Sequence, residues 1–96
     1  MTFSIKFTPI ALEHLRNFRK FEQKKIVEAI KQQLIYEPLA PTRNRKPLRN
    51  NPLSRWELRV EDYRVFYDVE NQVVEIKAIG YKEHNQLFIK GKEFKL

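Results

Sequence analysis

The sequence predicts an α+β domain in which two helices cover one face of an antiparallel β-sheet. Three observations predict it: an alternating apolar segment comes first, two segments with helical spacing follow, and three strand-like segments lie close together in the second half. A chain of 96 residues is the size of one small domain, so we expect a single domain over residues 1–96.

The N-terminal half predicts a strand and two helices. Residues 2–7 alternate between apolar and polar side chains, which is typical of a half-buried strand. Thr8 and Pro9 then predict a helix start, with Thr8 as the N-cap and Pro9 in the first helical position. A second helix is expected from about residue 22 to residue 36, because apolar residues recur there on one stripe.

The second half predicts a loop and a meander. Four prolines punctuate residues 37–54, which indicates a long basic loop with a short strand around Leu48. Strand-like runs follow at residues 55–60, 63–69 and 73–79, and their short connections predict antiparallel pairing.

The alternation of side chains sorts this meander into two faces. If both connections have even length, Arg59 lies opposite Arg64. One face is then apolar and belongs under the helices; it holds Trp56, Leu58, Val60, Tyr63, Val65, Tyr67, Val74, Ile76 and Ala78. The other, which we call the second face, holds Arg55, Glu57, Arg59, Arg64, Phe66, Asp68, Val73, Glu75, Lys77 and Ile79.

The charge of the chain indicates a polyanionic partner. The net charge is +7 and the pI is near 9.8, and residues 41–60 alone carry a net charge of +5. Nucleic acid, an acidic protein and anionic lipid all fit this charge. Arg59 opposite Arg64 predicts an anion held between two guanidinium groups. The alternative is that Glu57 and Asp68 neutralise the arginines and the face is simply solvated.

Several classes of function lack their sequence signals. The chain has no cysteine, which fits a reducing cytoplasm and excludes disulfide or thiolate chemistry. It has no membrane-length apolar run, no signal-peptide layout at its N-terminus, and no phosphate loop or dinucleotide fingerprint. His14, expected on the surface, and His84 are too far apart to predict a metal site, so we expect no metal or cofactor.

Three stretches resemble one family. "WELRVEDYRVFYDV" followed by "VVEIKAIGYKEH" resembles the RelE/ParE superfamily of bacterial toxins, and "KPLRNNPLSRWELR" resembles its RelE and YoeB branches. The resemblance implies a toxin encoded beside an antitoxin. RelE-like members cut mRNA in the ribosomal A site by attack of a ribose 2′-OH on the adjacent phosphate, whereas ParE members poison DNA gyrase.

The resemblance implies roles for individual residues. Arg64 matches the family's "YR" arginine, which contacts the reacting phosphate, and Lys82 stands at a catalytic arginine position of RelE. Arg55 and Glu57 stand where RelE has two lysines, so the charge is kept at the first and reversed at the second. His84 lies in the segment where YoeB-like members place a catalytic histidine.

Other positions depart from the family pattern. Lys46 stands near the glutamate base of YoeB, and Phe88 stands near a functional tyrosine of RelE but has no hydroxyl. We therefore expect Glu57 as base and His84 as acid. The full set of expected catalytic residues is Arg64, Lys82, His84 and Glu57, and the expected phosphate-binding residues are Lys46, Arg49, Arg55, Arg59 and Lys77.

We thus expect a cytoplasmic, ribosome-dependent mRNA endoribonuclease of the RelE-like branch. A gyrase inhibitor without catalysis, or an inactive homologue that binds nucleic acid and antitoxin, are the alternatives. The expected partners are an acidic antitoxin that folds over the helices, the ribosome and mRNA, and operator DNA through the antitoxin complex. No membrane partner is expected.

Overall fold

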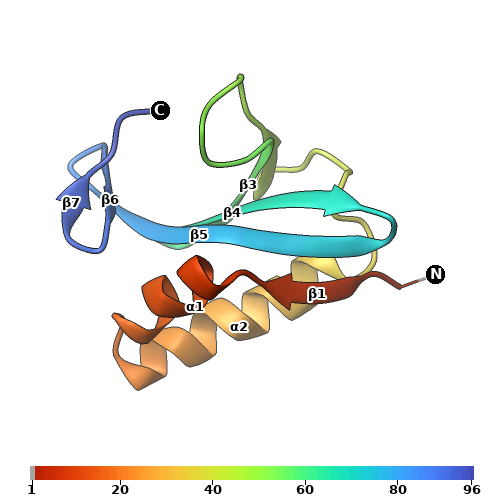
Figure 1. The fold of residues 1–96 in the computed structure, drawn as a ribbon, viewed down its shortest axis with the longest axis horizontal. Helices are drawn as coiled ribbons and strands as arrows, with labels where there is room; N and C mark the ends of the chain where they lie inside the picture. Colours follow the sequence, from red (N-terminus) through yellow and green to blue (C-terminus); the bar gives the residue numbers. More distant parts are fainter. Residues whose placement is uncertain (1) are drawn as a thin grey trace.

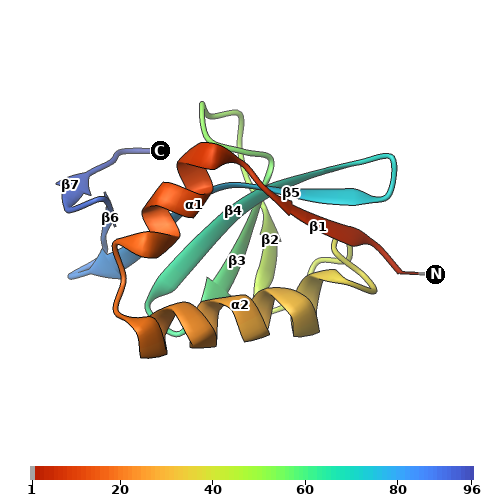
Figure 2. The same ribbon diagram turned by 60° about the horizontal axis from the view of Figure 1, so that its bottom comes forward.

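The computed structural model describes residues 2–96, and these form two helices and a seven-stranded sheet. The helices α1 (Pro9–Arg16) and α2 (Lys20–Leu34) lie together on one face of the sheet (Figures 1 and 2). The predicted α+β fold, with helices on one sheet face, is confirmed. The strands are β1 (Ser4–Phe7), β2 (Arg45–Pro47), β3 (Trp56–Val60), β4 (Tyr63–Glu70), β5 (Val73–Glu83), β6 (Gln86–Ile89) and β7 (Lys92–Glu93).

The sheet extends the predicted meander on both sides. Strands β2 to β7 follow one another in spatial order and pair antiparallel. The N-terminal strand β1 pairs in parallel with the first half of β5. Residues 86–93, whose conformation the sequence pattern left open, form the small β6–β7 hairpin.

Local capping explains where the helices begin. The Thr8 hydroxyl accepts a hydrogen bond from the backbone N–H of Ala11 at 3.0 Å, as the N-cap prediction requires. The second helix starts at Lys20, about two residues earlier than predicted. There the Glu22 carboxylate accepts the backbone N–H of Arg19 at 3.0 Å and satisfies a donor at the helix start.

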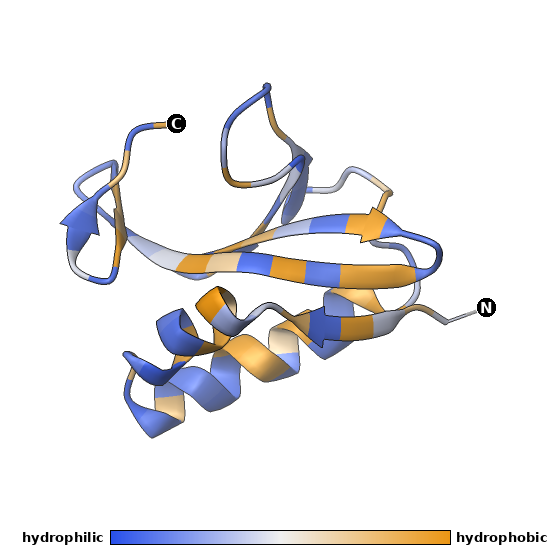
Figure 3. Cartoon of the chain, in the orientation of Figure 1, coloured by the Kyte–Doolittle hydropathy of each residue, from blue (hydrophilic) through white to orange (hydrophobic). Residues whose placement is uncertain are grey.

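The main core lies between the helices and the sheet. Figure 3 shows apolar residues on the inner sides of the helices and polar residues on their outer sides. The buried members are Ala11, Leu15, Ile26, Ile30, Leu34, Leu58, Tyr63, Val65, Tyr67, Val74, Ile76 and Ile79. The Tyr67 hydroxyl donates to the Pro38 carbonyl at 2.7 Å, so the only polar atom of this side chain is satisfied.

A β-bulge makes part of the face assignment wrong. Tyr67 pairs with Ile76 and Phe66 pairs with Ala78, so Lys77 is an extra residue in β5. Beyond this point the alternation shifts by one residue. Ile79 therefore lies in the main core, and Ala78 lies on the second face, the reverse of the prediction for both. The β3–β4 register, including Arg59 opposite Arg64, is confirmed.

The second face has a small apolar cluster of its own. Phe66, Ala78 and Leu87 are buried there, under residues from the 48–54 loop and the β6–β7 hairpin (Figure 1). Gly80 lies within β5, and a Cβ added to it would come within 2.4 Å of the Phe88 carbonyl oxygen. Only glycine therefore allows β6 to approach this closely.

Candidate functional site

A buried carboxylate lies among cations on the second face. Glu57 in β3 is 4% exposed, and its carboxylate lies 3.9 Å from the Nε atom of Arg59. Lys46 in β2 is the strand partner of Glu57, and Arg64 in β4 is the strand partner of Arg59. The pairing thus gathers one carboxylate, two arginines and a lysine, which we call the Glu57–Arg64 cluster.

Arg64 is the most constrained member of this cluster. It is 8% exposed, and its Nη1 atom donates to the carbonyls of Glu61 and Tyr63, both at 2.8 Å. Its Nε atom is buried without a hydrogen-bond partner. Burial lowers the pKa of the Arg64 guanidinium; Glu57 opposes this shift and Arg59 adds to it. An unpaired buried donor is costly, so a ligand oxygen that reached it would be stabilised.

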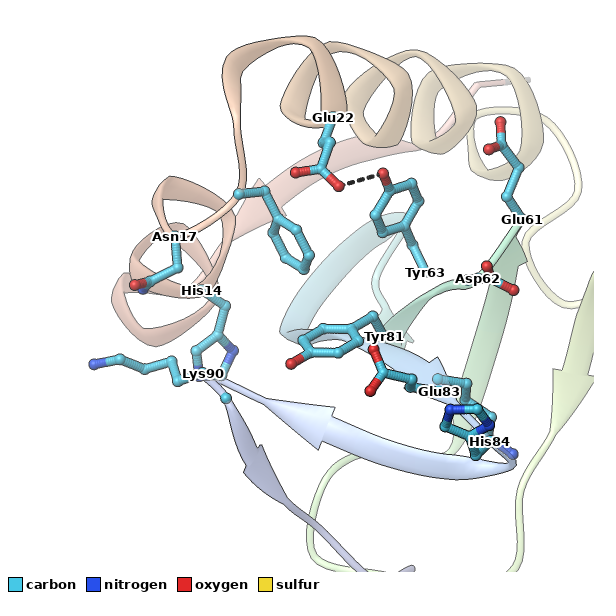
Figure 4. A pocket seen from close by; sticks show the side chains of 13 residues that line it. His14, Asn17, Glu22, Glu61, Asp62, Tyr63, Tyr81, Glu83, His84 and Lys90 are labelled. Atoms are coloured by element: carbon cyan, nitrogen blue, oxygen red, sulfur yellow. Dashed lines mark hydrogen bonds between the residues drawn. The ribbon is translucent and has the colours of Figure 1, made fainter.

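Lys82 and His84 line a different part of the molecule. Both border a cavity of about 860 Å³ between α1, the Glu61–Asp62 turn and the end of β5, which we call the hairpin cavity (Figure 4). His84 is exposed at the tip of the β5–β6 turn, with a φ of 53°. Within residues 2–96, no hydrogen bond or ion pair joins His84 to Glu57.

Acidic and aromatic side chains dominate the hairpin cavity. Glu22, Asp62 and Glu83 border it. The Tyr63 hydroxyl donates to the Glu22 carboxylate at 2.6 Å (Figure 4). Burial, followed by this hydrogen bond, raises the pKa of Tyr63 to about 12. Tyr63 therefore stays protonated at neutral pH and is unsuited to acid–base work.

Tyr81 is a candidate residue that the sequence reasoning missed. It pairs across β5 and β6 with Phe88, and the two rings stack with centroids 5.5 Å apart. Tyr81 also borders the hairpin cavity beside Lys82. The resemblance implies a functional tyrosine near Phe88. The structure has a tyrosine hydroxyl on the neighbouring strand instead, at Tyr81. The only signal in the sequence was the position of Tyr81 directly before Lys82.

His14 is buried, not exposed as predicted. It is 8% exposed, and its Nδ1 atom accepts the backbone N–H of Ile79 at 3.2 Å. That bond requires an unprotonated Nδ1 and so fixes the neutral tautomer. Burial lowers the pKa of His14, an effect that Glu13 opposes and Lys90 reinforces. The hydrogen-bond partner of His14 is a backbone group 65 residues away in the sequence. The polar neighbours of His14 along the helix gave no sign of this contact, so the residue was predicted to lie on the surface.

The remaining predicted cations lie around a third region. Arg49, Arg55 and Lys77 border a cavity of about 420 Å³ beside the bulge in β5, which we call the bulge cavity. Arg49 also borders a neighbouring cavity of about 590 Å³ together with Lys46. The predicted residues thus fall into three groups: two lie on the second face, and the third borders the hairpin cavity, which residues of both helices also line. Residues 2–96 hold no group of three side chains suited to bind a metal ion.

The comparisons with known proteins agree with this architecture. A family model for the ParE toxin of the type II toxin–antitoxin system parDE matches residues 5–86. A solved structure, the toxin–antitoxin complex RelBE2 from Mycobacterium tuberculosis, contains a similar chain with 25% sequence identity and a TM-score of 0.73. The match covers 85% of this chain and 100% of that chain. No curated protein matches.

These matches define a type II toxin of the RelE/ParE superfamily, and the predicted resemblance is confirmed. Within it, the chain belongs to the family of ParE toxins. Neither helix in the described part of the chain is long and apolar enough to cross a membrane.

Proposed function

We propose that the chain is an mRNA-cleaving toxin that acts on the translating ribosome. The observation that supports this proposal is the Glu57–Arg64 cluster, in which a buried carboxylate lies among cations on the second face. Attack of a ribose 2′-OH on its adjacent phosphate needs a proton acceptor and cations that stabilise the crowded phosphorane. This cluster offers both kinds of group.

The proposed chemistry assigns one role to each group. Glu57 accepts the 2′-OH proton as the new bond from O2′ to phosphorus forms. Arg59 and Arg64 stabilise the added negative charge, and the unpaired Nε of Arg64 is a ready donor. The bond from phosphorus to O5′ then breaks, and His84 or Lys82 protonates the leaving oxygen. The products are a 2′,3′-cyclic phosphate and a 5′-hydroxyl.

The burial of the carboxylate sets a condition on this mechanism. Because Glu57 is 4% exposed, the substrate must enter from the second face and displace the Arg59 side chain, which is 45% exposed. His84 at its turn must also reach the leaving oxygen from the adjacent hairpin. Both adjustments concern side chains at the surface, since Arg59 and His84 are exposed.

Mapping of mRNA 5′ ends after expression of the chain alone tests the proposal. We expect new ends within translated mRNA, no cuts in naked mRNA, and arrested translation. Glu57→Gln and Arg64→Lys should reduce cutting at least about 100-fold, since each removes a group used only in the transition state. Lys24→Gln on the exposed side of α2 is the matched control and should cut normally. Intact mRNA in growth-arrested cells would refute the proposal.

A gyrase inhibitor is the second candidate, and two observations favour it. The matching family model is that of ParE toxins, and the contacts among residues 2–96 do not join His84 to Glu57. A non-catalytic inhibitor needs neither residue to meet the other. An SOS-response reporter, read in the same cells as the mRNA ends, separates the two candidates. SOS induction with intact mRNA identifies the inhibitor, and absence of toxicity identifies an inactive homologue.

An antitoxin is the proposed partner under both candidates, since the similar solved structure is a toxin–antitoxin complex. The helical layer exposes Ile10 (61%) on α1 and Phe21 (58%) among the lysines of α2, a surface that an acidic, partly apolar chain would cover. The ribosome and operator DNA are further proposed partners, and the proposed compartment is the cytoplasm.

A further inference from the structure

The second face carries a cationic site that is separate from the Glu57–Arg64 cluster. Arg49, Arg55 and Lys77 border the bulge cavity. Arg55 precedes β3, whereas Arg59 lies near the other end of that strand. Glu57, Arg59 and Arg64 do not border the bulge cavity, so the two sets of cations are placed at different points of the second face.

The bulge is what brings Lys77 to this cavity. Lys77 is the unpaired residue between Ile76 and Ala78, and such a residue is free to point away from the regular alternation. It borders the cavity beside Asp68 of β4. The irregularity in the sheet thus coincides with the placement of a cation, as is common for bulges near binding sites.

The loop that supplies Arg49 is fixed before any ligand binds. Asn51 makes four hydrogen bonds within it: its Oδ1 accepts the backbone N–H groups of Leu53 (2.8 Å) and Ser54 (3.2 Å), and its Nδ2 donates to the carbonyls of Arg49 (2.7 Å) and Ser54 (2.9 Å). The backbone N–H of Arg55 donates to Asp68 Oδ1 at 2.6 Å. A preorganised backbone lowers the entropic cost of binding.

The charges at the cavity favour an anion. Three cations face one lining carboxylate, Asp68, whose Oδ1 already accepts the Arg55 N–H. Glu75 lies next to the cavity and pairs with Lys77 at 3.2 Å. Both side chains of this pair are more than a third exposed, so the pair is weak and a phosphate can replace the carboxylate.

We propose that the bulge cavity binds a backbone phosphate of a single nucleic-acid strand. Arg49 also borders the next cavity with Lys46, and Lys46 is the strand partner of Glu57. Cations therefore follow one another from Lys77 through Arg49 and Lys46 to the Glu57–Arg64 cluster. The identification of this strand as mRNA rests on the proposed function. The role of the cavity is to hold the strand, several ångströms from the reacting phosphate.

Binding of a fluorescein-labelled, single-stranded oligouridylate to the full chain at several salt concentrations tests this proposal. We expect Lys77→Gln and Arg55→Gln each to weaken binding several-fold at low salt. Each should also reduce the slope of log K against log [salt] by about 0.7, because each removes one phosphate contact. Lys24→Gln is the matched control with the same charge change on α2. Unchanged slopes in both cavity variants, or an equal loss in Lys24→Gln, would overturn the proposal.

Two further arms separate this inference from the proposed function. Oligothymidylate should bind with the same Lys77 dependence, because a phosphodiester is the ligand in both cases; exclusive dependence on duplex DNA would contradict a single-strand site. In the mRNA-cleavage assay, Lys77→Gln should raise KM and leave kcat near the wild-type value. If the chain cuts no mRNA but binding still depends on Lys77, the cavity is retained and the proposed function fails.

Discussion

The two faces of one sheet differ in how they are stabilised. Within residues 2–96, the helix-covered face packs twelve buried apolar or tyrosine residues into one continuous core. The second face buries three apolar residues and beside them Glu57 and Arg64, whose charges are only partly compensated. Buried charge is expensive unless it is paired and hydrogen-bonded. The helix-covered face therefore supplies stability. The second face contains charged groups that a bound ligand would compensate better than the free protein does.

The coverings of the two faces differ in the same way. Two helices of 8 and 15 residues cover the core. A proline-rich loop and a hairpin of short strands cover the second face. Regions with few buried apolar contacts open locally at lower free energy than the global unfolding. The second face should therefore open locally for a ligand while the core stays folded.

Truncation of one core residue on each face gives the largest expected difference. Ile76→Ala, at a fully buried site, should lower the free energy of unfolding by about 2–5 kcal/mol. Leu87→Ala on β6 should cost less, because the hairpin can settle into the space or detach locally. Urea denaturation measures the first effect. Hydrogen exchange of residues 86–93 reports the second, with faster exchange there and unchanged exchange in α2.

Equal losses of global stability in these two variants would contradict the comparison. In that case the β6–β7 hairpin would be as much a part of the cooperative core as β5. Accelerated exchange in α2 of Leu87→Ala would point to the same conclusion. Tyr63→Phe provides a reference value for these losses of stability, because it removes only the hydrogen bond to Glu22. It should lower the free energy of unfolding by about 1 kcal/mol.

Gly80→Ala tests how closely the β6–β7 hairpin packs against the second face. The added Cβ meets the Phe88 carbonyl at 2.4 Å and the Ile89 side chain at 2.9 Å, so β6 must shift. We expect a loss of about 1–3 kcal/mol, typical of overpacking, with altered chemical shifts around Leu87. Gly91→Asn is the control: that site has open space and a φ of 76°, which asparagine tolerates, so stability should change little. A fully stable Gly80→Ala with unchanged shifts would show that β6 does not lie this close.

The sequence predicted the sheet up to the bulge and not beyond it. Arg59 opposite Arg64 followed from the short connection between β3 and β4, and it is confirmed. Nothing local marks Lys77 as an extra residue, because Val74 to Ala78 alternate between apolar and charged residues as in an unbroken strand. The bulge depends on how β4 and β5 twist under the helices, which is a tertiary effect. For this reason Ala78 and Ile79 were assigned to the wrong faces.

The sequence predicted which residues belong to the candidate site, but it did not predict how they are arranged. The basic residues and Glu57 followed from charge and from the family resemblance. Their division into three groups could not, since it depends on the bulge, on the loop fixed by Asn51 and on the fold of β6 over the second face. The roles of Glu57, Arg64, Lys82 and His84 remain predictions that only the cleavage assays can test.

The smallest expected effect concerns pH and a buried histidine on the helix-covered face. His14 on α1 accepts the N–H of Ile79 on β5, and its pKa in the folded state is lowered by burial. Above about pH 6.5 the imidazole is neutral in both folded and unfolded chains, and its contribution to stability is complete. As the pH falls below this value the unfolded chain takes up the proton first, so stability decreases until the folded pKa is reached. Urea midpoints at pH 7.5 and pH 5.0 measure this loss.

His14→Asn should make the stability curve flatter between these two pH values, because the asparagine Oδ1 can accept the same N–H without titrating. His84→Asn is the matched control: it makes the same substitution at an exposed turn, away from the contact between α1 and β5. If His14→Asn keeps the full pH dependence of stability, protonation of His14 at the contact between α1 and β5 does not cause it. If it flattens the curve, acidification weakens the contact of α1 with β5, just where β5 leaves the helices to form the hairpin cavity. The core face would then also contain one contact that weakens in acid, the bond between His14 and the backbone of Ile79.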